Sequence, residues 1–128
     1  MINKIEINTD KAPSAIGPYS QAIKAGDMLY VSGQIPIDPT TGKLDNDSFE
    51  SQVMRVFENL KSICEYSGAN INNIVKLNLY LTDLGNFNIV NDIMKVLFKK
   101  PYPARATVEV SKLPKDVEFE ADAIVHLG

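Results

Sequence analysis

Two charged residues, Arg105 and Glu120, stand in segments whose other residues are mainly apolar. Arg105 is one of only two arginines and follows the stiff sequence Pro101-Tyr102-Pro103. Arginine binds a carboxylate through two parallel hydrogen bonds from its planar guanidinium group, which lysine cannot copy. Arg105 is therefore a candidate for holding the carboxylate of a small acid. An ion pair with a surface acid explains the position equally well, and both interpretations stay open.

Glu120 lies between Phe119 and Ala121 in a segment that alternates apolar and polar residues. A carboxyl group that loses water there would have a raised pKa, which suits a general acid or base. Taken alone, the position fits better a solvent-facing acid in a row with Glu118 and Asp122.

Two glycine-containing segments could add polar groups to such a site. The turn Gly17-Pro18-Tyr19 offers a phenol, and Ser32-Gly33 at the end of a predicted strand offers a hydroxyl and backbone N–H groups. Turns of this kind are common without function, so this pattern is weak by itself.

Metal and nucleotide chemistry finds no support in the residue types present. A single histidine excludes H-E-x-x-H zinc sites, and neither a Walker A loop nor G-x-G-x-x-G occurs. His126 fits a surface residue near the chain end, and Cys64 falls in the apolar stripe of a predicted helix, where an inert thiol is expected. We predict a protein without cofactor or metal.

The hydrophobic periodicity predicts the order β-β-β-α-β-α-β-β. Strands are expected around Ile5 and Ile7 and over 20–25, 28–35, 75–81, 106–110 and 117–127. One helix begins with Asp47 or Ser48 as cap and ends at Gly68. The other is capped by Asn86 and stopped by Pro101. Arg55 falls off the apolar stripe of the first helix, so we expect it on a solvated face.

Such an order predicts a two-layer α+β domain over residues 1–128, with both helices on one face of a mixed sheet. The other face would carry a mixture of polar and apolar side chains, which is typical of a surface that meets another subunit. The residues expected there are Tyr30, Ser32, Asn78, Tyr80, Glu118 and Glu120.

Composition restricts the class of protein. The 128 residues are 45% hydrophobic and 23% charged, with a net charge of −3 and no basic run that could follow a phosphate backbone. One cysteine excludes an internal disulfide, and neither a signal peptide nor an apolar membrane span is recognisable. These features predict a cytoplasmic protein that binds neither membrane nor nucleic acid.

Five segments in order resemble the RidA (YjgF) family, over about residues 11–127. They are Ala15-Ile16-Gly17-Pro18-Tyr19-Ser20-Gln21-Ala22, Val31-Ser32-Gly33-Gln34-Ile35-Pro36, Pro103-Ala104-Arg105-Ala106, Leu113-Pro114-Lys115 and the last strand around Glu120. The order and spacing of the five are far more specific than any one motif.

The resemblance implies a chorismate-mutase-like fold and a homotrimer with pockets between subunits. It also implies hydrolytic deamination of 2-iminopropanoate and 2-iminobutanoate, or the enamines that precede them, to 2-keto acids. By matching positions, Arg105 would hold the substrate carboxylate and Glu120 would activate water. The other residues implied to line the pocket are Tyr19, Ser32, Gly33, Asn91 and, where many relatives have cysteine, Thr107.

Two other functions stay open at this point. The same pocket could bind small carboxylates without turning them over, since fold alone does not separate an enzyme from a binding module. Cleavage of single-stranded RNA is attributed to some relatives, but the acidic balance and lone histidine argue against it.

Overall fold

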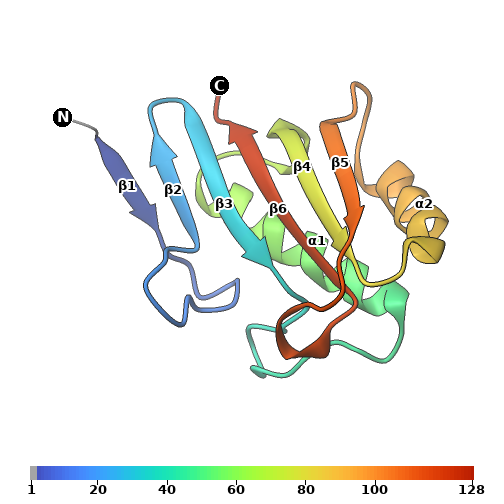
Figure 1. Cartoon of the computed structure of the whole chain (residues 1–128). Coiled ribbons are helices and arrows are strands. Elements are labelled where there is room, and N and C mark those ends of the chain that lie inside the picture. The colour runs from blue at the N-terminus through green and yellow to red at the C-terminus, as the bar shows by residue number, and fades with distance from the viewer. Residues whose placement is uncertain (1–2) are drawn as a thin grey trace.

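The computed structural model describes residues 3–128 and consists of two layers, a six-stranded sheet and two helices that cover one of its faces (Figure 1). This confirms the predicted α+β class and element order. The strands are β1 (Lys4–Ile7), β2 (Ala22–Ala25), β3 (Met28–Gln34), β4 (Ile74–Leu81), β5 (Ala104–Glu109) and β6 (Phe119–His126), and the helices are α1 (Phe49–Tyr66) and α2 (Phe87–Leu97).

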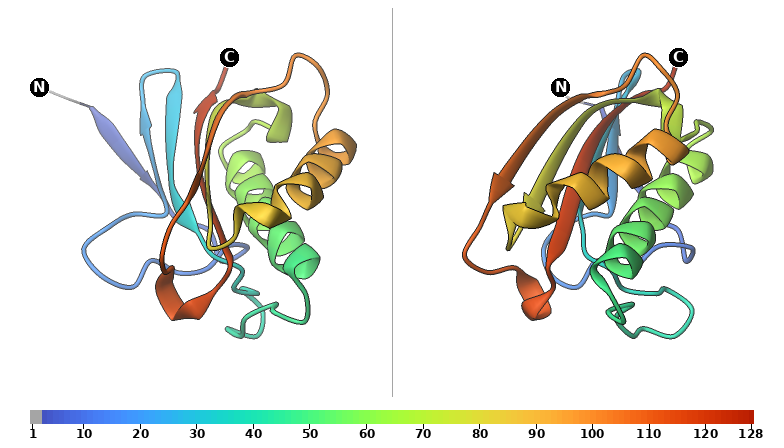
Figure 2. Two further views of the ribbon diagram at one scale, coloured as in Figure 1. Left: turned by 45° about the vertical axis from the view of Figure 1, so that its right-hand side comes forward. Right: turned by 90° about the vertical axis from the view of Figure 1, so that its right-hand side faces the viewer.

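Across the sheet the strands follow the order β1-β2-β3-β6-β4-β5. Every neighbouring pair is antiparallel except β4 and β5, which are parallel. A parallel pair needs a crossover connection, and α2 supplies it. Both helices therefore lie on the same side, α1 behind the centre of the sheet and α2 beside β5, as the turned views make clear (Figure 2). We call the uncovered side the open face.

The core fills the space between the sheet and α1. Residues of α1 at helical spacing, among them Val53, Leu60 and Ile63, are completely buried. Phe57 packs edge-on against Phe98 and tilted against Phe119, with ring centroids 5.7 and 5.9 Å away. Burying one such ring stabilises the fold by about 1.5–3 kcal/mol. This aromatic cluster therefore holds the end of α2, at Phe98, and the start of β6, at Phe119, against α1.

The ends of the elements differ from the prediction where local chemistry competes with periodicity. Ser48 caps α1 as expected, and its hydroxyl accepts a hydrogen bond from the Ser51 N–H. Asn86 occupies the cap position of α2, but its side chain makes no capping hydrogen bond, because the turn before it is capped by Asp83 instead. β6 begins at Phe119 rather than at residue 117, since the chain forms a 3-10 turn at Pro114–Asp116 just before the strand.

The prediction of a solvated Arg55 was wrong. Its guanidinium group donates to Asp45 at 2.8 Å and lies 3.7 Å from Asp38, with only 22% of the side chain exposed. Both acids belong to the loop that connects β3 to α1. Arg55 therefore binds this long connection to the helix, and its charge is paired with these two carboxylates.

Cys64 is completely buried in α1, as predicted, and burial raises the pKa of its thiol to about 12. At neutral pH this group is a protonated, apolar side chain and not a nucleophile. We expect Cys64→Ala to retain full activity and to lose roughly 1 kcal/mol of unfolding free energy through the small cavity left behind. Urea denaturation and an activity assay measure the two effects, and a folded but inactive variant would contradict this interpretation.

No helix within residues 3–128 is both long and apolar enough to cross a membrane.

Candidate active site

Arg105 projects from β5 toward the helix layer, where three residues of α2 contact its guanidinium group. Its Nη1 donates to the Asn91 Oδ1 at 2.7 Å and lies 3.5 Å from the Met94 sulfur. The Phe87 ring lies beneath the group, with its centroid 4.9 Å from Cζ, a favourable cation–π distance. Phe87, Asn91 and Met94 share one face of α2 because they are spaced by about one helical turn. Residues of a single helix therefore orient this guanidinium.

The hydrogen bonds of Arg105 leave one edge of the guanidinium unused. Both start from Nη1, and within residues 3–128 Arg105 forms no salt bridge. Nε and Nη2 together form a fork that matches the two oxygens of a carboxylate. The surface ion pair considered above is thus absent among the described residues, and the arginine is oriented to receive an external acid.

A cavity of about 330 Å³ opens at this arginine, between α2 and the segment before β5. It is lined by Asn91, Met94, Lys95, Tyr102, Pro103 and Arg105. None of these side chains is acidic, so the lining favours an anion. Thr107 follows on the same side of β5, but it is not among the lining residues. Its hydroxyl oxygen is buried without a hydrogen-bond partner within the described chain.

Glu120 lies on the open face, where β6 runs beside β3 and β4. Two residues of β3, Ser32 and Gly33, stand opposite the single residue Asp122, which makes a β-bulge in β3. The Glu120 carboxyl group lies directly over Gly33, so closely that a Cβ atom there would collide with one of its oxygens. Glycine at position 33 therefore lets the Glu120 carboxylate keep this position over the bulge, and a larger residue would push it aside.

The surroundings of Glu120 make its carboxyl group a better proton acceptor than an exposed glutamate. Burial raises the pKa of Glu120 above its usual value, and the charge of Asp122 raises it further. Asp122 is itself held by Asn78, which donates to Oδ1 at 2.8 Å, and by the Tyr80 hydroxyl, which donates to Oδ2 at 2.9 Å. Tyr80 is the cross-strand partner of Glu120, so Asp122 is fixed next to the group that it influences.

Gly33 connects Glu120 with a second group of predicted site residues, Tyr19 and Ser32. Tyr19 and Gly33 line a second cavity of about 330 Å³, between the loop that precedes β2 and the 3-10 turn at Pro114–Asp116. The Ser32 hydroxyl donates to the Ser20 carbonyl at 2.6 Å. Its proton therefore ties β3 to that loop, while its oxygen can still accept a hydrogen bond from a ligand.

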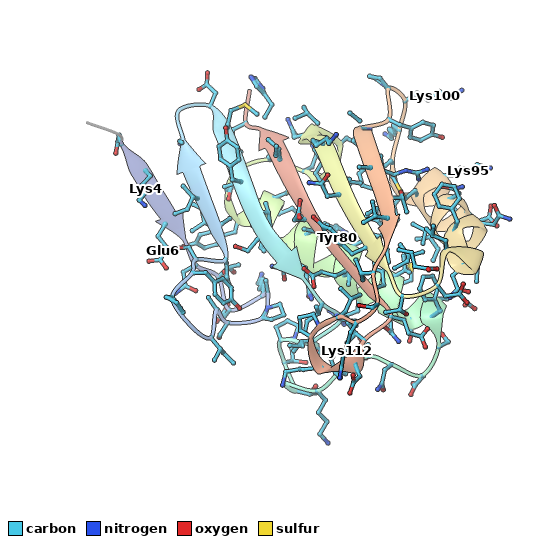
Figure 3. All side chains as sticks on the ribbon, in the orientation of Figure 1. Lys4, Glu6, Tyr80, Lys95, Lys100 and Lys112 are labelled. Atoms are coloured by element: carbon cyan, nitrogen blue, oxygen red, sulfur yellow. The ribbon has the colours of Figure 1, made fainter. Side chains whose placement is uncertain are left out.

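The predicted site residues thus form two groups on opposite faces of the sheet. Arg105 is paired with Leu77, which is buried under the helices, whereas Glu120 is paired with Tyr80 on the open face. Side chains alternate between faces along β4, so these two partners point in opposite directions. Figure 3 shows Tyr80 at the centre of the open face and Lys95 out on α2. One chain does not bring Arg105 and Glu120 together.

A family model described as Endoribonuclease L-PSP matches residues 9–127, nearly the whole chain. The solved structure of RidA from an Antarctic Psychrobacter is 46% identical and superposes with a TM-score of 0.92, covering 95% of this chain and 98% of its own. The chain belongs to the RidA family.

Relatives named for an activity or a bound ligand lie within this RidA family. A 2-iminobutanoate/2-iminopropanoate deaminase of Dermatophagoides farinae is 40% identical over 119 residues, which cover 93% of each chain. The structure of Escherichia coli TdcF with bound serine is 36% identical, with a TM-score of 0.88, and covers 95% of this chain and 98% of its own. The family therefore includes reactive-intermediate deaminases.

The sequence pattern did not identify four residues around Arg105. Met94, Lys95 and Tyr102 line the cavity, and the Phe87 ring lies against the guanidinium group. The spacing of Phe87, Asn91 and Lys95, each one helical turn from the next, was the available signal. Among residues 3–128, no group of three or more histidine, cysteine or acidic side chains is arranged to hold a metal ion.

Proposed function

We propose that this protein hydrolyses reactive 2-imino acids, such as 2-iminobutanoate and 2-iminopropanoate, to 2-keto acids and ammonia in the cytoplasm. The observation that carries the proposal is the oriented, unpaired guanidinium of Arg105 at a cavity without acidic residues. A 2-imino acid offers the carboxylate that such a fork binds, next to the carbon that reacts. The deaminase among the relatives adds to this support.

The reaction needs a bound carboxylate, a placed water and proton transfers. Glu120 accepts a proton from water, whose oxygen attacks C2, and the C=N electron pair moves to nitrogen, which takes up a proton. The resulting carbinolamine then loses the C–N bond, so that ammonia leaves and C=O forms. Water and imine are consumed in equal amounts, and no electrons are exchanged. Because the imine carbon is already electrophilic, positioning and one general base suffice.

We infer that Arg105 of one copy and Glu120 of a neighbouring copy form one site, because they lie on opposite faces of the sheet in a single chain. The open face carries Tyr30, Val75 and Val108, each about half exposed, among the polar residues described above. Such a mixed surface is typical of subunit contacts.

The mixed face supports an oligomer, and the resemblance to the RidA family implies three copies, so we expect a homotrimer, which light scattering with size-exclusion chromatography can measure. A particle of about three times 14.2 kDa is the expected result at micromolar concentration. A monomer with full deaminase activity would contradict a site shared between copies.

Deamination is proposed over RNA cleavage, the activity in the description of the family model. The cations of the arginine cavity stand alone in a chain of net charge −3, and His126 lies exposed at the end of β6, far along the strand from Glu120. A ribonuclease needs several phosphate contacts and an acid–base pair, and neither cavity offers both.

A coupled assay tests the proposal directly. An L-amino-acid oxidase with catalase generates the imine in place, and semicarbazide competes with the protein for it. A deaminase lowers semicarbazone formation in proportion to its concentration, and keto acid accumulates in its place, while total ammonia is unchanged because semicarbazide also displaces ammonia from the imine. If the wild-type protein does not change semicarbazone formation, but still binds 2-oxobutanoate in calorimetry, then a non-catalytic binding module replaces the enzyme.

A further inference from the structure

The arginine cavity contains a second cation, Lys95, which lies one helical turn after Asn91 on α2. Both Lys95 and Arg105 line the cavity, and no lining residue is acidic. Within residues 3–128 neither side chain forms a salt bridge. Figure 3 shows Lys95 on α2 beside the segment that carries Lys100 and leads into β5.

Two unpaired cations at one cavity repel each other, and this repulsion is relieved by a ligand with two negative charges. Two cations at a cavity without an acidic lining residue are unusual in this chain, because it has more acidic than basic residues. A monocarboxylate occupies only the Arg105 fork. It leaves Lys95 without an anion at the same cavity.

We propose that Lys95 selects 2-imino acids that carry a second carboxylate on the side chain, such as 2-iminosuccinate and 2-iminoglutarate. This inference rests on the proposed function, since it assigns the substrate class of the same site. Arg105 binds the carboxylate next to the reacting carbon. Lys95 binds the distal carboxylate as a point charge on a flexible stem, which tolerates one or two methylene groups between the acids.

The cavity also has room for the longer side chain. Its volume of about 330 Å³ lies at the lower end of the range for small-molecule pockets. Met94, Tyr102 and Pro103 line the same cavity and provide apolar surface against which the methylene groups of a dicarboxylic acid can pack. Lys95 is a specificity-determining residue in this arrangement, because it touches the substrate but not the reacting atoms.

The test compares Lys95→Met with Lys99→Met, a matched control in which the lysine just beyond the end of α2 is outside the cavity. Methionine keeps an unbranched apolar stem and removes the charge. Turnover is measured on 2-iminosuccinate, generated by an L-aspartate oxidase, and on 2-iminopropanoate. Binding of the stable products is measured by calorimetry, with 2-oxoglutarate as the dicarboxylate and 2-oxobutanoate as the monocarboxylate.

Wild type should prefer the dicarboxylates in both measurements. Lys95→Met should lower kcat/KM for 2-iminosuccinate and affinity for 2-oxoglutarate by about tenfold, with the monocarboxylates within about twofold and Lys99→Met like wild type. Equal losses for both classes, or none, would overturn the role of Lys95 while leaving deamination intact. If wild type turns over neither imine, the proposed deaminase function fails, and with it the assigned substrate class.

Discussion

Replacing Arg105 with lysine is expected to lower kcat/KM for 2-iminobutanoate on the order of a hundredfold, nearly as far as Arg105→Ala. A charge-assisted hydrogen bond contributes roughly 1.5–3 kcal/mol, and a misplaced carboxylate moves the reacting carbon away from the water. Lysine keeps the charge but has neither the fork nor the planar group that packs on Phe87 at 4.9 Å. Both variants should fold, because Arg105 is only half-buried at the edge strand.

The other arginine provides a matched control for this experiment. Arg55→Lys removes a guanidinium that ties down the loop around Asp38 and Asp45, so it should lower thermal stability without changing kcat/KM. Circular dichroism confirms folding in each case. Near wild-type turnover in Arg105→Lys would refute bidentate binding, and near wild-type turnover in Arg105→Ala would remove the main support for the deaminase.

Glu120→Gln is expected to lower kcat by at least about a hundredfold, since general base catalysis contributes typically 10²–10⁴-fold. Glutamine keeps the size of the side chain over Gly33 but cannot accept the proton. The pH profile gives a second readout. Glu120 acts in its ionised form, so activity should rise as pH increases through its raised pKa, above the ordinary value of 4.5, and then level off. The residual activity of Glu120→Gln should show no such rise.

Asp122→Asn tests the cause of the pKa shift. Its carboxylate contributes to the raised pKa of Glu120, after the larger effect of burial. Removing this charge should move the acidic limb of the profile to lower pH, while the neighbouring Tyr80 and the backbone of Gly33 stay in place. An acidic limb at the same pH in Asp122→Asn would show that the charge has no influence.

The raised pKa of Glu120 also affects stability. Folding favours the protonated form of Glu120, so its contribution to stability falls as pH rises through that pKa.

The helices and their faces could be predicted from the sequence because burial repeats with a recognisable period. Phe57, Leu60 and Cys64 are spaced as one face of a helix requires, and all three are buried against the sheet. The exact ends were less predictable. Asn86 has the residue type of a helix cap, yet its side chain makes no such bond, since capping depends on the turn that precedes it.

The grouping of the site residues could not be predicted, because it depends on which strands are neighbours. Alternation along a strand shows which residues share a face, but not that β6 is inserted between β3 and β4. That insertion brings Glu120 over Gly33 from a distant part of the chain. The place of Arg105 follows from the parallel pairing of β4 and β5, which sequence periodicity does not encode. The resemblance supplied these residues, and the structure supplied their contacts.

The position of Arg105 and Glu120 on opposite faces has a consequence for mixed assemblies. If Arg105 and Glu120 of neighbouring copies form one site, as proposed, an oligomer of Arg105→Ala and Glu120→Gln chains still has junctions at which an intact arginine of one chain meets an intact glutamate of the next. Two proteins that are each inactive could then restore activity when they are expressed together or unfolded and reassembled as a mixture. A chain that carries both substitutions would instead inactivate the two sites that it shares with its neighbours. Complementation between defective copies is thus the expected property of a sheet that carries Arg105 on one face and Glu120 on the other.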